Sequence, residues 1–183
     1  HAAAVEGNAA IHRHVLEAPD LEGMGTTLTA ILFKGTRLGL VHIGDSRAYQ
    51  LRDGTLTQIT KDDTFVQSLI DEGRITEAES RVHPHRNIIL KAVDGVHDSD
   101  PDLFIVDLQP GDRVMLCSDG CSGALDNDHI ARVLAQGSVD FAAVELRTLA
   151  AVCKAHYGCS RLGNIISQGV DPHAFTAAAV QGL

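Results

Sequence analysis

The sequence has few aromatic side chains, and its apolar residues are scattered in short runs. Tryptophan is absent and aromatic residues make up only 4% of the 183 residues, whereas hydrophobic residues make up 44%. This content is typical of a soluble globular protein whose core is built from aliphatic side chains. The apolar runs are far shorter than the roughly 20 residues that cross a bilayer. We therefore expect no membrane span and a single domain over residues 1–183.

Basic residues are also scarce. Fifteen Lys and Arg stand against 24 Asp and Glu, which gives a formal net charge of −9. Nucleic acids and anionic membranes attract basic surfaces, so this charge argues against either partner. The start, His1-Ala2-Ala3-Ala4, is not a charged region followed by an apolar stretch. No signal peptide is expected, and the expected location is cytoplasmic.

The four cysteines do not form a CxxC pair. They are Cys117, Cys121, Cys153 and Cys159. Cys117 closes an apolar run, which favours reduced cysteines in the core over disulfides or a zinc site.

Residues 25–59 carry the strongest strand signals of the chain. Apolar runs alternate with period two, and the links Lys34-Gly35-Thr36 and Arg52-Asp53-Gly54 are typical of hairpin turns. These signals predict an antiparallel meander of three runs. Polar residues interrupt the runs only intermittently, so we expect the strands to be buried on both faces.

Two acidic residues follow apolar strands directly. Asp45 lies in Gly44-Asp45-Ser46, and Asp119 lies in Ser118-Asp119-Gly120 after the apolar run 113–117. Gly-Asp-Ser alone is also ordinary turn chemistry, because Asp can bond its own backbone. A pair of such carboxylates in an acidic chain instead favours a hard-cation site, since Mg²⁺ and Mn²⁺ take oxygen ligands.

Five ordered segments resemble the bacterial metal-dependent Ser/Thr protein phosphatases of type 2C, the PPM family. They are residues 24–30, 41–49, 56–66, 83–92 and 111–120. The resemblance implies an α+β fold, an antiparallel β-sandwich flanked by helices in four αββα layers. It also implies a binuclear Mn²⁺ or Mg²⁺ centre that hydrolyses phosphoserine and phosphothreonine in proteins and opposes bacterial Ser/Thr kinases. By resemblance, Asp119 ligates a metal and Asp45 helps to hold a third, more weakly bound ion.

The sequence also departs from the family pattern. An arginine that holds phosphate, an acidic NED block and a DGMGGH block precede these segments in the family, and none of them occurs here. Gly163 stands before Asn164, where the family has a metal-ligating Asp. We therefore expect a fold that is incomplete at the N-terminus, with uncovered strand edges that favour self-association. The alternative function is a non-catalytic module that binds a phosphoprotein or a regulatory partner.

Residues 62–92, here called the flap segment, are expected to form two short helices. Asp62-Asp63 would cap the first helix, Gly73 would end it, and Thr76 with Glu79 has capping-box spacing for the second. The charged residues of the segment either contact a phosphopeptide or face only water. Of these, Arg86 is the candidate for substrate binding; the others are Asp62, Asp63, Arg74 and Arg81.

The remaining signals are helical. Residues 2–16 form an apolar stripe that ends before Pro19, Asp126 would cap a helix, and residues 139–153 would form another helix with Phe141 and Val144 available for the core. Asp107 and Asp112 are expected at a strand end and in a turn. Residues 172–183 are expected to be a tail of uncertain order.

Overall fold

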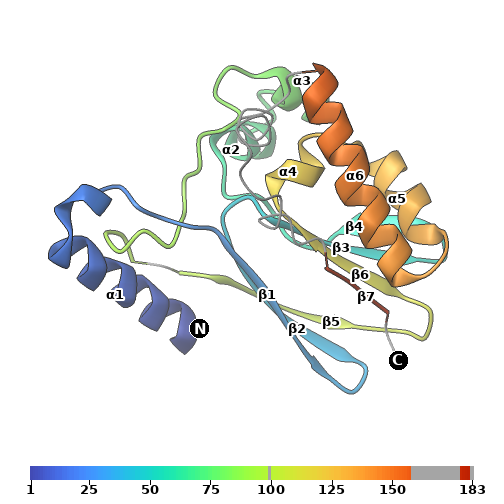
Figure 1. The fold of residues 1–183 in the computed structure, drawn as a ribbon, viewed down its shortest axis with the longest axis horizontal. Coiled ribbons are helices and arrows are strands. Elements are labelled where there is room, and N and C mark those ends of the chain that lie inside the picture. Colours follow the sequence, from blue (N-terminus) through green and yellow to red (C-terminus); the bar gives the residue numbers. More distant parts are fainter. Residues whose placement is uncertain (99, 158–177, 182–183) are drawn as a thin grey trace. The chain divides into compact units, whose positions relative to one another are not determined.

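The computed structural model describes residues 1–98, 100–157 and 178–181. The chain divides into two compact units: residues 1–46 with 61–107, and residues 47–60 with those from 108 onward. Each unit has its own antiparallel sheet (Figure 1).

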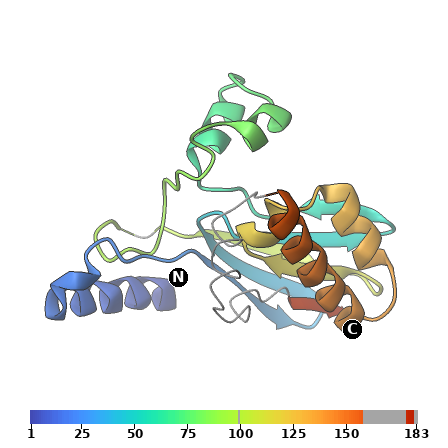
Figure 2. The ribbon, with the colours of Figure 1, turned by 45° about the horizontal axis from the view of Figure 1, so that its top comes forward.

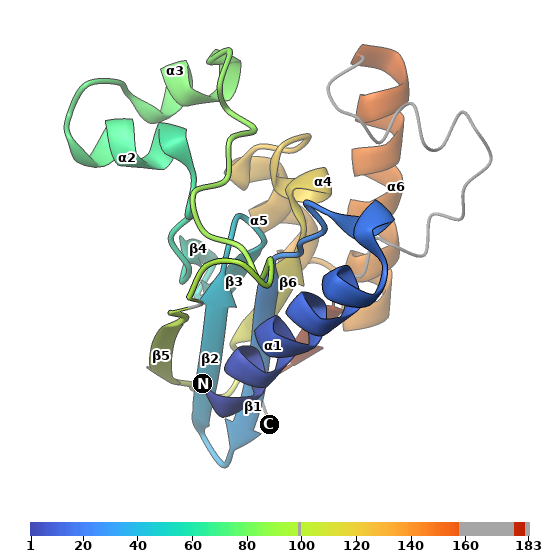
Figure 3. The same ribbon diagram turned by 90° about the vertical axis from the view of Figure 1, so that its left-hand side faces the viewer.

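The first unit contains the three-stranded sheet, in the order β1-β2-β5. Its strands are β1 (Leu28–Lys34), β2 (Arg37–Ile43) and β5 (Asp102–Asp107). Its helices are α1 (Ala2–Glu17), the 3₁₀ turn η1 (Pro19–Leu21), α2 (Phe65–Asp71) and α3 (Glu77–Val82). The tight β1–β2 hairpin pairs Lys34 with Arg37, and Gly35 supplies the φ of 61° that the turn requires. Figure 3 shows α1 as one continuous helix.

The second unit contains the four-stranded sheet, in the order β4-β3-β6-β7. Its strands are β3 (Arg47–Arg52), β4 (Thr55–Gln58), β6 (Arg113–Cys117) and β7 (Ala178–Gln181), and its helices are α4 (Asp119–Ser122), α5 (Asn127–Ala135) and α6 (Val139–Tyr157). Asp53 and Gly54 both have positive φ, as a two-residue hairpin turn demands. Strands and helices share one apolar cluster: Tyr49, Leu51, Met115, Cys117, Cys121, Leu125, Ile130, Leu134, Ala142, Leu146 and Ala150.

The helices and antiparallel sheets confirm the α+β class, but the prediction of one meander is wrong. The two hairpins form as predicted, β1 with β2 and β3 with β4. β2 then pairs with β5, and β3 pairs with β6. The chain thus changes sheet at Gly44–Ser46. Hairpin turns are specified locally, whereas the partners β5 and β6 come from distant sequence that turn signals do not report.

The prediction that the early strands are buried on both faces is also wrong for the three-stranded sheet. Leu32, Gly39 and Ile105 are register partners on one face. Leu32 is 75% exposed, Ile105 is 72% exposed and Leu103, two residues along β5, is 60% exposed. On the other face Leu38 and Leu40 are buried. Self-association through uncovered strand edges remains a prediction.

Several helix predictions are confirmed and two are corrected. α3 has the predicted capping box between Thr76 and Glu79. α2 is capped by Thr64, whose hydroxyl accepts from the Gln67 amide, and not by Asp62 or Asp63. Figure 2 shows α2 and α3 as a consecutive helical pair.

Among residues 139–151 of α6, whose side chains are described, the buried ones are Ala142, Leu146 and Ala150, spaced four residues apart, while Phe141 and Val144 are exposed. The buried stripe of a helix follows its period of 3.6 residues, and here two alanines and a leucine lie on that stripe. Phe141 and Val144 point away from it, so their predicted place in the core is wrong.

Part of the predicted tail is ordered. Ala178–Gln181 forms β7, whose Val180 is the register partner of Val114 in β6. The other residues of the 172–183 segment lie outside the described part. Among the described residues, no helix has both the length and the apolar character needed to cross a membrane.

Candidate metal centre

The turn that carries Asp45 is held in a conformation that only glycine adopts easily. Gly44 follows β2 with a φ of 106°. A Cβ atom at this position would lie 2.4 Å from Thr27 Cγ2, closer than any real contact. The close approach of Thr27 and the positive φ together explain the glycine before Asp45.

Polar side chains in and next to β1 and β2 fix the backbone of the turn at Ser46. The Thr27 and Ser46 hydroxyl oxygens are 2.9 Å apart, and the Thr29 hydroxyl donates to the Ser46 carbonyl at 3.0 Å. Thr29 Oγ1 also lies 2.9 Å from Nδ1 of His42, which is 1% exposed. Nε2 of His42 lies 3.0 Å from the Lys61 carbonyl, which can only accept, so Nε2 carries a proton. His42 therefore links β1 to the residue that precedes the flap segment.

Asp63 binds the backbone of the turn at Gly44. Its carboxylate accepts from the Gly44 amide at 2.9 Å, and its own amide donates to the Gly44 carbonyl at 2.7 Å. Lys91 Nζ lies 3.3 Å from the second carboxylate oxygen. Burial opposes the charge of Lys91, but the carboxylates of Asp63 and Asp102 outweigh it and raise the pKa of the ammonium group. The side chain of Asp63 is 11% exposed, so it faces the turn and not a phosphopeptide.

Asp119 lies in a different local structure. It is the first residue of α4, a single helical turn that follows β6 directly. Its carbonyl accepts from the Gly123 amide at 2.7 Å, and Gly120 beside it is buried. Asp119 itself is exposed.

Two buried thiols flank Asp119. Cys117 ends β6 and Cys121 lies in α4, and neither forms a disulfide. A hydrogen bond with Cys121, together with burial, raises the pKa of the Cys117 thiol well above its ordinary value. The prediction of reduced core cysteines is confirmed for these two. The side chain of Cys153 and all of Cys159 lie outside the described residues.

Arg86 lies in the exposed turn after α3, with its amide donating to the His83 carbonyl at 3.1 Å. The rings of Phe65, His83 and His85 pack beside this turn, with the two imidazole centroids 5.6 Å apart. The His83 Nδ1 accepts from the His85 amide, which accounts for His-x-His as a packing element. The role of Arg86 in substrate binding stays a prediction.

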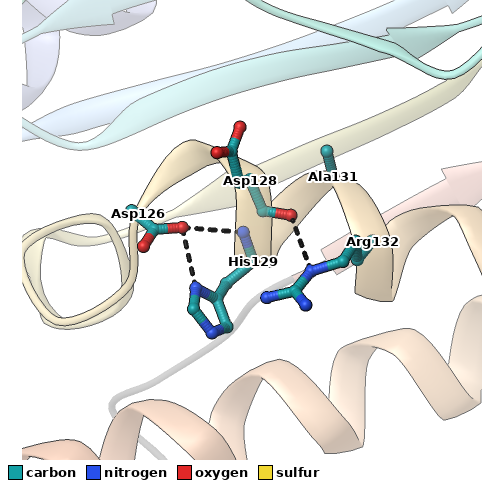
Figure 4. A pocket seen from close by; sticks show the side chains of 5 residues that line it. All are labelled: Asp126, Asp128, His129, Ala131 and Arg132. Carbon is teal, nitrogen blue, oxygen red and sulfur yellow. Dashed lines mark hydrogen bonds and ion pairs between the residues drawn. The ribbon is translucent and has the colours of Figure 1, made fainter.

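Two other acidic residues have structural partners. Asp112, expected only as a turn residue, is buried, and a hydrogen bond from Arg52 lowers its pKa to about 2. Asp126 caps α5 as predicted and accepts from both the amide and Nδ1 of His129, at 2.8 Å each. Figure 4 shows these contacts in a shallow surface pocket that Asp128 and Arg132 also line. Neither carboxylate is arranged as a cation ligand.

The donor chemistry of Asp45 and Asp119 suits Mg²⁺ or Mn²⁺, because both present carboxylate oxygens at strand ends. They belong to different units. Within residues 1–98, 100–157 and 178–181, no three His, Cys, Asp or Glu side chains gather closely enough to hold a metal ion. Each carboxylate therefore fits as a member of a ligand set that the described residues do not complete.

Asp63 is the residue of this region whose place the sequence did not reveal. In Asp62-Asp63-Thr64 three consecutive side chains are able to cap a helix, and only the fold assigns Thr64 to that task.

The model of the protein phosphatase 2C family matches residues 2–152, and the chain belongs to this family. The serine/threonine protein phosphatase PstP of Mycobacterium tuberculosis (strain ATCC 25618 / H37Rv) is 59% identical over 133 residues, which are 73% of this chain and 26% of that protein.

Solved structures agree in fold. The crystal structure of M. tuberculosis PstP/Ppp has a TM-score of 0.76 and 55% identity, over 80% of this chain and 62% of that one. The catalytic domain of PstP in complex with two manganese ions has a TM-score of 0.74 and 53% identity, over 80% of this chain and 60% of that one. The chain thus spans about a quarter of the curated relative and about three fifths of the solved ones.

Proposed function

We propose that the chain is part of a metal-dependent phosphatase that hydrolyses phosphoserine and phosphothreonine in proteins. Support comes from family membership, from the M. tuberculosis relative named a serine/threonine protein phosphatase, and from the glycine-dependent turn that presents Asp45. The turn carries the proposal, because a mere surface turn does not need its backbone to be fixed from both sides. A cytoplasmic role opposite bacterial Ser/Thr kinases belongs to the same proposal.

Asp119 and Asp45 would bind divalent cations, Mn²⁺ or Mg²⁺, together with ligands from outside the described residues. Support comes from their carboxylate chemistry and from the relative solved with two manganese ions. When bound, such ions activate a water and offset the charge of the phosphoryl oxygens. In this chain Gly44, Thr27 and Asp63 would hold Asp45 in place. The end of β6 would hold Asp119.

The flap segment would contact the phosphoprotein. Arg86 lies in an exposed turn beside exposed apolar side chains, Ile88, Ile89 and Leu90. A guanidinium suits phosphate because it forms two parallel hydrogen bonds with it. Apolar residues next to such a group would contact the peptide around the phosphorylated residue.

The test is Mn²⁺-dependent hydrolysis of p-nitrophenyl phosphate and of a phosphothreonine peptide by the purified chain. Asp119→Asn should remove the Mn²⁺-dependent rate, because the amide keeps the shape of the side chain but removes its charge. Asp128→Asn is the matched control, since Asp128 is an exposed acid on α5 of the same unit.

Equal Mn²⁺-dependent rates for Asp119→Asn and Asp128→Asn would exclude Asp119 from the reaction. If the unmodified chain shows no rate above the metal-free background, the result favours the alternative function of a phosphatase-like binding module. Repeating the assay with Mg²⁺ in place of Mn²⁺ decides which ion supports the higher rate.

A further inference from the structure

Asp63 joins three segments of the first unit. Its carboxylate and its amide bind the amide and the carbonyl of Gly44, at 2.9 Å and 2.7 Å. Its own carbonyl accepts from the Leu90 amide at 2.7 Å, and its carboxylate pairs with Lys91 at 3.3 Å. Asp63 therefore stands where the flap segment begins and binds the residues where that segment ends.

The bonds to Gly44 control the direction in which the chain enters Asp45. A peptide unit is planar, so the Gly44 amide reports the plane before Gly44 and its carbonyl reports the plane between Gly44 and Asp45. Fixing both planes restrains φ and ψ of Gly44, and so the direction in which the chain enters Asp45. Gly44 alone would not supply this restraint, because glycine loses more conformational freedom on ordering than other residues.

The bonds are strong enough for this role. Asp63 is mostly shielded from water, and a hydrogen bond from an amide to an ionised carboxylate is stronger than one between neutral groups. Lys91, whose Nζ also lies 3.8 Å from Asp102, supplies the opposite charge. Lys91 thus helps to keep the Asp63 carboxylate directed at the turn.

We propose that Asp63 is a positioning residue that orients Asp45 for cation binding and ties that orientation to both ends of the flap segment. This proposal rests on the proposed function, in which Asp45 is a cation ligand. Asp63 itself does not contact the cation; it acts through the Gly44–Asp45 peptide.

Calorimetric titration of Mn²⁺ tests this role. Asp63→Ala should weaken Mn²⁺ binding by up to about tenfold, the lower end of the range seen when residues that orient metal ligands are removed. Asp63→Asn retains an acceptor oxygen for the Gly44 amide and should restore part of the affinity. The control is Asp71→Ala, which removes an ion pair with Lys61 at 2.6 Å in the same segment but does not touch the turn. Its Mn²⁺ affinity should stay within about twofold of the unmodified chain.

A double mutant separates positioning from general stability. In an Asp45→Ala background, Asp63→Ala should change the Mn²⁺ affinity by no more than about twofold, because its effect passes through Asp45. The proposal would be overturned if Asp63→Ala lowered the Mn²⁺ affinity as much in the Asp45→Ala background as it does in the unmodified chain. It would also be overturned if Asp63→Ala bound Mn²⁺ as tightly as the unmodified chain.

Amide hydrogen exchange of the metal-free chain tests the clamp independently of Mn²⁺. The Gly44 amide should be protected in the unmodified chain and in Asp71→Ala, and should lose protection in Asp63→Ala while the β2–β5 pairing keeps its own. If the unmodified chain bound no Mn²⁺, the proposed function would fail while this loss still supported the clamp. Unchanged Gly44 exchange in a folded Asp63→Ala variant would exclude the clamp.

Discussion

The turns of Asp45 and Asp119 have the same sequence signature and different supports. Each acid follows an apolar strand and stands between small residues. Asp45 lies in a non-helical turn whose preceding glycine is bound on both sides by Asp63 and crowded by Thr27. Asp119 opens a helical turn whose neighbours, Cys117 and Gly120, are buried in the core of its unit. The first orientation depends on polar contacts with distant segments, whereas the second depends on core packing.

The largest expected effect separates the two carboxylates. Asp119→Ala should abolish Mn²⁺ binding, a loss above the roughly 100-fold upper range for residues that only orient ligands, whereas Asp45→Ala should cost about tenfold. The difference follows if Asp119 ligates a tightly held ion and Asp45 a weaker one. Calorimetric titration of both variants measures it, and equal binding by Asp119→Ala and the unmodified chain would remove Asp119 from the site.

The next prediction concerns the backbone of the Asp45 turn. Gly44→Ala should lower the free energy of unfolding by about 3 kcal/mol, because a positive φ and a clash with Thr27 act together. Gly35→Ala, also at positive φ but with no atom within 4 Å of the added Cβ, should cost only about 1 kcal/mol. Urea unfolding of the two variants provides the comparison. Similar losses would show that Thr27 moves aside.

A smaller effect belongs to the opposite end of β6 from Asp119. The Arg52 hydrogen bond lowers the pKa of Asp112 from its ordinary 3.8 to about 2. A lowered folded-state pKa stabilises the fold above the unfolded pKa, and this contribution is lost as pH falls through the folded value.

The shift corresponds to about 2 kcal/mol, present above about pH 4 and lost towards pH 2. As the pH falls through this window, the free energies of unfolding of the unmodified chain and of Asp112→Asn should thus approach each other. A constant difference from pH 6 to about pH 2 would contradict the assignment.

The smallest effect tests whether core packing next to Asp119 influences the cation. Cys117→Ser places a hydroxyl in a buried site and should cost about 1 kcal/mol of stability. Mn²⁺ affinity should stay within about twofold, because the side chain packs in the core and Asp119 is exposed. Thermal unfolding and calorimetry on one preparation give both quantities. If Cys117→Ser lost more free energy of Mn²⁺ binding than of unfolding, core packing at Cys117 would influence the cation site at Asp119.

Turn chemistry and periodicity identified most of the elements correctly. Both hairpins, the capping box of α3 and the Asp126 cap of α5 formed where the residues predicted them, because each depends on contacts within a few residues. The two acids at the ends of β2 and β6 were located by the same kind of local pattern. Family membership, suggested by five ordered segments, is shown by the match over residues 2–152.

Most of the elements, the two acidic turns and the family could therefore be predicted from the residue pattern. Three features follow from the fold alone: β2 and β3 lie in different sheets, Asp112 pairs with Arg52, and Asp63 holds Gly44 while Thr64 caps α2. Each of these depends on residues at least 19 positions apart or on a choice among neighbouring polar side chains. Local propensity predicts neither the distant partners nor the choice among neighbouring side chains. The free energy that selects a bonding partner arises only when the fold brings distant backbone groups and charges together.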